Sequence, residues 1–236
     1  MNFISEIYWD KGERDINQDS VSLQEVRIKG EKVMFALICD GIGGLWGGEE
    51  ASGFVTERMT EWFYKDALTM IRKKKRRKRI EKAGLRALYS CNEEMRQFGK
   101  EKGMKFGTTV TMMILKGRHY FLWHSGDTRA YLVTAGRKQK RMKRLTVDSR
   151  TLIRCIGSFE WKKPDVQNGY LKKKSVILLC TDGFRNRIEE GKIEEAMQPG
   201  LLHSREQIYM RLKEIAEYVK RRGEKDNITA IAIRLE

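Results

Sequence analysis

The chain has 236 residues, enough to bury a substantial core, and no Pro-, Ser- or Gly-rich linker interrupts it, so we predict a single domain over residues 1–236. Its start has neither a basic nor an apolar signal region, and its longest apolar runs are strand-sized. The sequence therefore argues against a signal peptide and a membrane span. The formal net charge of +16 favours anionic partners, namely acidic or phosphorylated proteins, nucleic acid or an anionic membrane surface.

Short apolar runs rich in β-branched and aromatic residues recur along the chain and predict β-strands. In chain order they are Phe3–Trp9, Val33–Cys39, Thr109–Leu115, Tyr120–Trp123, Ala130–Val133, Val176–Cys180 and Ile228–Ile233. Apolar residues at helical spacing predict helices at three places. They are Ala51, Val55, Met59 and Trp62; Leu85, Leu88, Tyr89 and Met95; and Ile208, Leu212, Ile215 and Val219. Because the two early helices are consecutive and strands bunch after them, we predict an α+β fold with antiparallel sheet and helices packed outside.

An unbroken basic run, Arg72–Arg79, separates the two early helices, and its eight charges are half of the formal net charge of +16. A second basic cluster spans Arg137–Arg144. One interpretation is that the first run docks acidic or phosphorylated proteins. The alternative is a solvated, charged connection between helices, which is the more usual role of a charge run.

Three aspartates stand where predicted strands end or begin. Asp40 closes the run Val33–Cys39, Asp182 follows Val176–Cys180 by two positions, and Asp226 stands just before the last strand. If the last strand runs antiparallel to the other two, all three carboxylates fall on one sheet edge. Carboxylates at such a short distance repel one another unless a proton or a cation lies between them. A hard divalent metal with oxygen ligands is the simplest solution.

Further polar residues accompany these aspartates in a fixed order. Arg14 precedes Asn17-Gln18-Asp19, Gly107-Thr108-Thr109 begins a strand, and Asp127 lies in the turn Ser125–Arg129. Lys225-Asp226-Asn227 comes last. Each piece alone is open to a plainer interpretation, since Asp19 and Asp127 could cap turns and Arg14 could lie on the surface.

Taken together and in this order, the pieces resemble the metal-dependent protein phosphatase family called PP2C or PPM, from about Gly12 to Ile233. The resemblance implies a four-layer α-β-β-α sandwich of two antiparallel β-sheets flanked by helices. It also implies hydrolysis of phosphoserine and phosphothreonine by a metal-activated water, without a phosphoenzyme. The implied cofactors are two Mn²⁺ or Mg²⁺ ions, with a possible third, weaker site.

The resemblance also implies a role for each matching metal ligand. Asp40 would bridge the two ions, and the Gly41 carbonyl would contribute to one of them. Asp182 and Asp226 would complete the ligands of the second ion. Asp127, together with Asp182, matches the pair that holds a third, weaker metal in bacterial members.

Three other matching residues would act around the metals. Arg14 matches the phosphate-binding arginine, whose planar fork suits two phosphate oxygens. Asp19 would hold a metal-bound water from behind the ligands. Asn227 would support the geometry of Asp226 rather than bind metal. The catalytic set implied by the resemblance is therefore Arg14, Asp40 and Asp182.

The chain departs from the family pattern at three places. Ile42 stands where many eukaryotic members have a histidine that is a candidate general acid, so metal-bound water would have to protonate the leaving group. Gln18 replaces an acidic residue found in some members. The chain passes from Asp148 to Gly157 with almost nothing between, where bacterial relatives usually carry a longer helical flap. We therefore predict a shortened or missing flap and a more open site.

The resemblance thus implies a bacterial-type Ser/Thr protein phosphatase that opposes a Ser/Thr kinase and acts on phosphorylated proteins, and we expect a monomer. Four cysteines without CxxC spacing favour a reducing, cytoplasmic location. The alternative is a non-catalytic basic module on the same fold that binds nucleic acid or acidic proteins. Such a module has no need of a carboxylate cluster, so we do not expect nucleic acid to be the main partner.

Overall fold

Two antiparallel β-sheets form the centre of the protein, as the computed structural model of residues 2–42, 47–136, 141–147, 155–157 and 161–236 describes it. The first sheet has the order β1 (Phe3–Asp10), β12 (Ile228–Leu235), β11 (Ser175–Cys180), β7 (Arg129–Thr134), β8 (Met142–Arg144). The second has the order β10 (Asp165–Tyr170), β6 (His119–Ser125), β5 (Val110–Lys116), β3 (Glu31–Asp40), β2 (Asp19–Ile28). A small ladder pairs β4 (Gly107–Thr108) with β9 (Ile156–Gly157).

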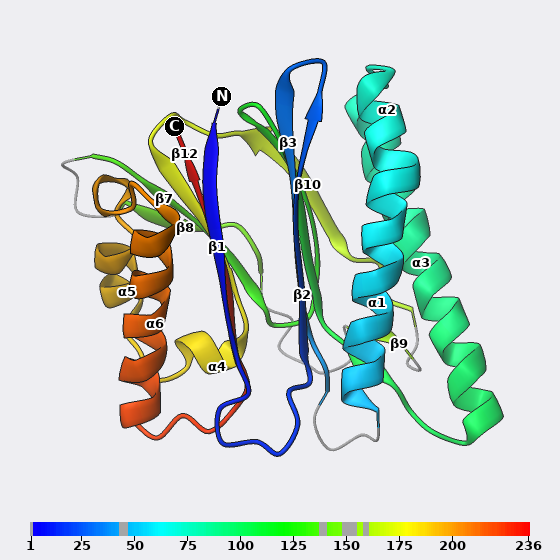
Figure 1. Ribbon diagram of the computed structural model, residues 1–236. Coiled ribbons are helices and arrows are strands. Elements are labelled where there is room, and N and C mark those ends of the chain that lie inside the picture. Colours follow the sequence, from blue (N-terminus) through cyan, green and yellow to red (C-terminus); the bar gives the residue numbers. More distant parts are fainter. Residues whose placement is uncertain (1, 43–46, 137–140, 148–154, 158–160) are drawn as a thin grey trace.

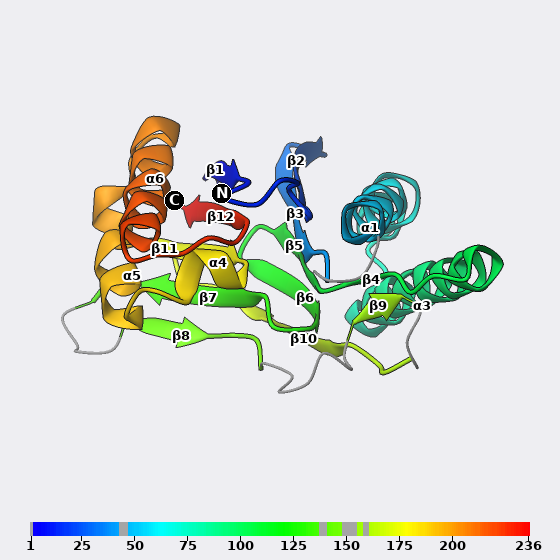
Figure 2. The same cartoon turned by 90° about the horizontal axis from the view of Figure 1, so that it is seen from below.

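Helices cover the outer face of each sheet (Figures 1 and 2). The second sheet is covered by α1 (Gly48–Trp62), the π-helical turn η1 (Phe63–Ala67), α2 (Leu68–Arg72) and α3 (Arg77–Lys102). The first sheet is covered by α4 (Asp182–Arg185), α5 (Glu190–Ala196), the 3₁₀ turn η2 (Pro199–Leu201) and α6 (Arg205–Arg221). Helix α6 begins where the Ser204 side chain accepts a hydrogen bond from the Gln207 backbone N–H, at 3.1 Å.

Strand β3 shows why the layers form. Its side chains alternate between the two faces of the sheet. Phe35 and Leu37 pack toward α1 and α3, whereas Met34 and Ala36 pack toward the other sheet. A strand that is buried on both faces reads as a continuous apolar run, which is what Val33–Cys39 is.

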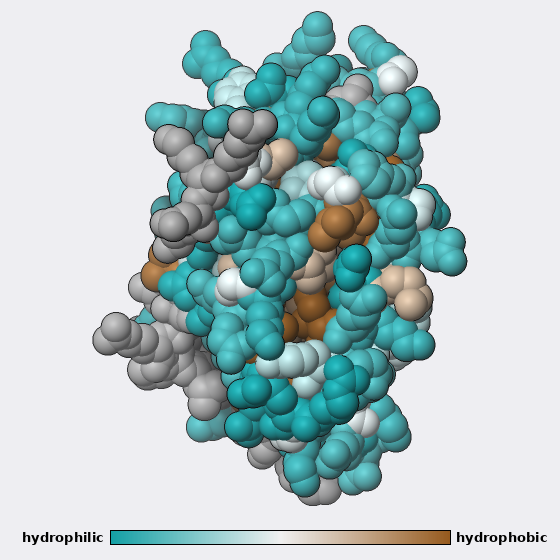
Figure 3. Space-filling view, turned by 90° about the vertical axis from the view of Figure 1, so that its left-hand side faces the viewer, coloured by the Kyte–Doolittle hydropathy of each residue, from teal (hydrophilic) through white to brown (hydrophobic). Residues whose placement is uncertain are grey.

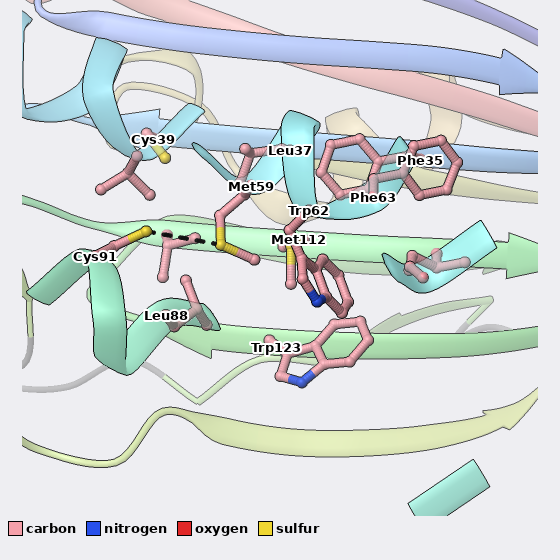
Figure 4. Close-up of a cluster of buried hydrophobic side chains, with 14 of the residues drawn as sticks. Phe35, Leu37, Cys39, Met59, Trp62, Phe63, Leu88, Cys91, Met112 and Trp123 are labelled. Atoms are coloured by element: carbon pink, nitrogen blue, oxygen red, sulfur yellow. Dashed lines mark hydrogen bonds between the residues drawn. The ribbon is translucent and has the colours of Figure 1, made fainter. Parts of the chain in front are cut away.

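Three apolar clusters fill the spaces between the layers. One lies between the two sheets, one between the second sheet and α1 with α3, and one between the first sheet and α5 with α6. Figure 4 shows the second of these, in which the rings of Phe35 and Phe63 stack at 4.7 Å between centroids. Three apolar clusters separate four layers, so the predicted α+β sandwich of two antiparallel sheets and flanking helices is confirmed.

The basic run Arg72–Arg79 forms the end of α2, a tight turn and the first residues of α3. Lys74 in this turn has a backbone φ of 50°. All eight side chains are exposed, and α3 begins inside the run rather than after it. Within the described ranges, no helix is long and apolar enough to cross a membrane. Figure 3 shows the face over α5 and α6, where hydrophilic residues dominate and hydrophobic ones gather near the middle.

Candidate active site

The polar residues singled out in the sequence meet at one end of the sandwich. They line a cavity of about 340 Å³. Its walls are Arg14, Gln18, Asp40, Gly41, Ile42, Thr109, Asp127, Asp182, Asp226 and Asn227. Strand β12 is antiparallel to β11, as expected, but Asp40 comes from β3 in the other sheet. The carboxylates therefore converge across the two sheets and not along a single sheet edge.

Asp40 is placed by hydrogen bonds of its backbone. Its N–H donates to the Thr109 hydroxyl at 2.9 Å, and its carbonyl accepts from the Thr108 hydroxyl and the Thr109 N–H, each at 2.9 Å. The next residue, Gly41, has no room for a side chain, because a Cβ atom there would lie 2.3 Å from the Gly48 carbonyl oxygen. The close approach of α1 thus requires glycine after the aspartate.

Asp182 and Asp226 come from neighbouring segments of the first sheet. Asp182 follows β11 and begins α4, and its Oδ2 accepts a hydrogen bond from the Asn186 side chain at 3.1 Å. Asp226 precedes β12. Gly183 lets the two segments approach each other, because a Cβ atom on it would lie 2.2 Å from the Asn227 carbonyl oxygen.

Asp19 is almost fully buried behind the cavity, with 2% of its surface exposed. It stands opposite Asp40 in the register of β2 and β3. Its Oδ2 accepts hydrogen bonds from the Thr229 hydroxyl at 2.6 Å and from the Thr181 hydroxyl at 3.2 Å. These hydroxyls link the second sheet to the ends of β11 and β12 in the first.

Arg14 lies in the loop between β1 and β2 and forms a two-pronged ion pair with Asp226. Its Nε and Nη2 donate to the two carboxylate oxygens at 3.1 and 3.0 Å. Asn227 anchors the same loop: its Oδ1 accepts from the Gln18 N–H at 2.9 Å, and its Nδ2 donates to the carbonyls of Lys11 and Ile16. Asn227 therefore positions the loop that carries Arg14.

The remaining predicted positions are also accounted for. Asp127 lines the cavity from the turn between β6 and β7, and its carbonyl accepts a hydrogen bond from Arg185 at 3.0 Å. Ile42 lines the wall of the cavity. An apolar side chain therefore occupies the position that the sequence analysis matched to a histidine of eukaryotic members. The predicted short segment from Asp148 to Gly157 falls mainly on residues 148–154, which lie outside the described residues, and so that prediction stays a prediction.

Mutual repulsion dominates the electrostatics of the cavity. Burial raises the pKa of Asp40 well above its usual range, and the charges of Asp19 and Asp182 raise it further. Burial raises the pKa of Asp182 as well, and Asp127 and Asp226 add to the effect. Asp19 has its pKa raised to about 7, first by burial and then by neighbouring carboxylates. Such a group of carboxylates is poorly stabilised by the protein alone.

The oxygen-only donor set is what a hard divalent cation such as Mg²⁺ or Mn²⁺ prefers. In the part of the chain that the structure describes, no three His, Cys, Asp or Glu side chains already converge closely enough to hold a metal ion. Asp226 is hydrogen-bonded to Arg14, and Asp182 is hydrogen-bonded to Asn186. The residues fit a divalent metal in kind, and metal binding would require these carboxylates to turn away from their present partners.

Sequence reasoning missed two groups that shape the site. Thr181 and Thr229 hold Asp19, and Asn186 holds Asp182. Thr181 belongs to the motif Thr181-Asp182-Gly183, but no role was predicted for its side chain, and nothing local in the sequence marks Thr229. Among the described residues that line the cavity there is no histidine.

Comparison with known proteins decides the family. A family model described as Protein phosphatase 2C matches residues 12–219. The chain belongs to the protein phosphatase 2C family. The resemblance to PP2C-type serine/threonine phosphatases that the sequence analysis described is thereby confirmed at the level of the family.

This protein phosphatase 2C chain is similar over its whole length to bacterial proteins. It is 22% identical to the serine/threonine phosphatase stp of Listeria innocua, with 97% of this chain and 94% of that protein covered. The structure of the phosphatase Stp1 of Staphylococcus aureus matches with a TM-score of 0.80 at 20% identity, covering 100% of this chain and 96% of that one. The structure of the S. agalactiae serine/threonine phosphatase matches with a TM-score of 0.79 at 21% identity, with full coverage of both chains. These structural likenesses show the shared fold.

Proposed function

We propose that this protein phosphatase 2C chain hydrolyses phosphoserine and phosphothreonine in phosphorylated proteins, with Mn²⁺ or Mg²⁺ as cofactor. The observation that carries the proposal is the convergence of Asp40, Asp182, Asp226 and Arg14 on one cavity of about 340 Å³. Carboxylates that raise one another's pKa values, next to a guanidinium, suit a site for divalent cations and a phosphate group.

Asp40 and the Gly41 carbonyl would hold two ions together with Asp182 and Asp226, and Asp127 with Asp182 would hold a third, weaker one. Divalent cations, when bound, lower the pKa of a bound water and neutralise charge on phosphoryl oxygens. Asp19 lies behind these ligands and is fixed by two threonine hydroxyls. We propose that it orients water in the site from this position.

Arg14 would bind two oxygens of the substrate phosphate. Its planar fork already engages two carboxylate oxygens of Asp226, and a phosphate presents oxygens at a similar spacing. Both partners of the present ion pair would therefore change on loading: Asp226 would turn to the metal, and Arg14 would become available for substrate. No histidine lines the described cavity, and Ile42 cannot donate a proton, so the leaving-group proton would come from water.

The physiological role would be to oppose a bacterial Ser/Thr kinase. We also propose that the protein is a monomer and that it works in a reducing cytoplasm. The buried thiols of Cys39, Cys91 and Cys155 support the reducing location. The alternative, a non-catalytic basic module that binds nucleic acid or acidic proteins, rests on the exposed basic run Arg72–Arg79. The metal-type donor set argues against it, since binding an anion gains nothing from clustered carboxylates.

The test is hydrolysis of a phosphothreonine peptide by the wild-type protein and by Asp182→Asn, with Mn²⁺ and with EDTA. We expect phosphate release that requires Mn²⁺ and falls by at least about 100-fold in the variant, because the loss removes stabilisation of the transferring phosphoryl group. Asp66→Asn, at an exposed carboxylate of η1, is the matched control. A folded wild-type protein without activity under any divalent metal would favour the binding module.

A further inference from the structure

A second concave surface lies at the pole of the molecule opposite the candidate active site. It encloses a cavity of about 320 Å³. Glu31, on its rim, begins strand β3, whereas Asp40 ends the same strand. A ten-residue strand spans about 30 Å. Figure 1 shows this pole where α2 ends and the β2–β3 hairpin turns, with the loops of the active site at the other end.

Positive charge dominates this cavity, which we call the basic pocket. Four cationic side chains line it, namely Lys74, Lys75, Arg77 and Lys116, against the single carboxylate of Glu31. Lys116 lies 3.5 Å from that carboxylate. Within the described ranges, no carboxylate comes within ion-pair distance of the other three. Because charge near the surface is only partly screened within about 10 Å, the pocket attracts anions.

The floor and one wall of the pocket are apolar. Ile71, Ile80 and Phe121 are buried there, and the His119 ring packs 4.6 Å from the Phe121 ring. Burial lowers the pKa of His119 and the charge of Arg77 lowers it further, against the opposing effects of the Asn168 hydrogen bond and the Glu81 charge. A pocket with cations on its rim and hydrocarbon on its floor suits a ligand that carries both acidic and apolar groups.

Arg77 is held in place by an aromatic partner. Its guanidinium lies 5.0 Å from the centre of the Tyr170 ring and also donates a hydrogen bond to the Tyr170 hydroxyl. The Tyr170 ring in turn packs 5.0 Å from His119. A cation oriented by an aromatic ring loses less side-chain freedom when it binds an anion than a free lysine does.

We propose that this basic pocket docks an acidic polypeptide segment of the phosphoprotein substrate, an inference that rests on the proposed phosphatase function. The cavity has the size of one or two side chains, which suits a peptide, whereas a nucleic-acid duplex is too wide to enter it. Glu31 can accept a peptide N–H, which neither a phosphate group nor a lipid headgroup phosphate can provide.

The separation of the two sites sets a rule for substrates. An extended peptide covers about 3.3 Å per residue, so at least ten residues must separate the acidic segment from the phosphorylated residue to span about 30 Å. Docking then raises the effective concentration of the phosphorylated residue at the active site. A shorter linker prevents simultaneous engagement and removes the benefit.

The test compares Lys74→Gln/Lys75→Gln/Lys116→Gln with a control that loses the same charge at exposed lysines elsewhere, Lys162→Gln/Lys163→Gln/Lys213→Gln. The first readout is fluorescence anisotropy of an unphosphorylated, labelled Glu-rich peptide, which needs no catalysis. We expect roughly tenfold weaker binding in the pocket variant, with the control close to wild type. Equal loss in both variants would show a general charge effect and overturn the pocket. Stronger binding of a DNA duplex or of phosphatidylserine vesicles, lost in the pocket variant, would overturn the peptide assignment.

The second readout is KM for phosphothreonine peptides that carry the acidic segment after linkers of about 4 or about 16 residues. In the wild-type protein we expect a KM about tenfold lower with the longer linker only, and no such gain in the pocket variant. A gain that does not depend on linker length would overturn the docking geometry. A short phosphopeptide without the segment should be hydrolysed equally by all three proteins. If none of them hydrolyses it, the proposed function fails, while anisotropy still decides on the pocket.

Discussion

Replacing Asp19 by asparagine should stabilise the metal-free protein at neutral pH. Asp19 is 2% exposed, and burial with nearby carboxylates raises its pKa from 3.8 to about 7. The folded protein therefore binds more protons than the unfolded chain between about pH 4 and pH 7, and its stability falls as the pH rises through this window. At pH 7 the ionisation of Asp19 costs the folded state about 4 kcal/mol relative to the unfolded state.

Asparagine removes this charge but keeps an oxygen that can accept from the Thr229 and Thr181 hydroxyls. Its new N–H₂ group needs an acceptor, and a buried donor without one costs about 1 to 3 kcal/mol. We therefore expect a net stabilisation of about 1 to 3 kcal/mol at pH 7, or roughly 2 to 12 °C in melting temperature. At pH 5 the ionisation cost falls to about 2 kcal/mol, so most of the advantage should disappear.

The assay is thermal and urea denaturation in EDTA from pH 5 to pH 8, for wild type, Asp19→Asn and the exposed control Asp66→Asn. Saturating Mn²⁺ should raise the stability of the wild type and reduce the advantage of Asp19→Asn, because the ion offsets the repulsion. If the variant is less stable than wild type at pH 7 without metal, the ionised Asp19 carboxylate does not destabilise the folded protein. A stability difference between the two proteins that does not change with pH would also exclude this effect of Asp19 ionisation.

Two other predictions follow from contacts in the cavity. Arg14→Ala should raise KM for a phosphopeptide, yet tighten Mn²⁺ binding several-fold in calorimetry, because Asp226 no longer has a competing bidentate partner; weaker Mn²⁺ binding would contradict the competition. Gly183→Ala should lower stability in urea by about 1 to 3 kcal/mol and abolish hydrolysis, because its Cβ atom would lie 2.2 Å from the Asn227 carbonyl oxygen. Gly191→Ala is the matched control, because a Cβ atom there would have no atom within 4 Å, and it should retain wild-type stability and hydrolysis.

Most of the strands that the sequence predicted are buried on both faces, although β1, a partly exposed edge strand, was predicted as well. Val33–Cys39 and Val176–Cys180 are apolar at nearly every position because helices cover one face and the other sheet covers the second. Strands β2 and β10 were missed, since each is an edge strand with many polar or partly exposed residues. The start of α3 was also missed, because its first buried residue, Ile80, comes after three basic residues that carry no apolar pattern.

The residues of the site could be predicted where their order along the chain matches that of a family. Contacts that depend on how distant segments pack together could not be predicted. Asp40, Asp182 and Asp226 stand at strand ends, so a local pattern marks them. The pairing of Arg14 with Asp226 joins positions 212 residues apart, and the burial of Asp19 under Thr229 depends on how two sheets meet. No local pattern encodes contacts of that kind.

We propose that Asp40, Asp182 and Asp226 hold the divalent cations on which hydrolysis depends. The most direct measurement is calorimetric titration of Mn²⁺ into EDTA-stripped protein, for wild type, Asp40→Asn and Asp226→Asn, with phosphopeptide hydrolysis followed in the same samples. We expect two ions per wild-type chain, loss of both in Asp40→Asn, loss of one in Asp226→Asn, and a parallel loss of activity. Unchanged Mn²⁺ binding in a folded Asp40→Asn variant would contradict it.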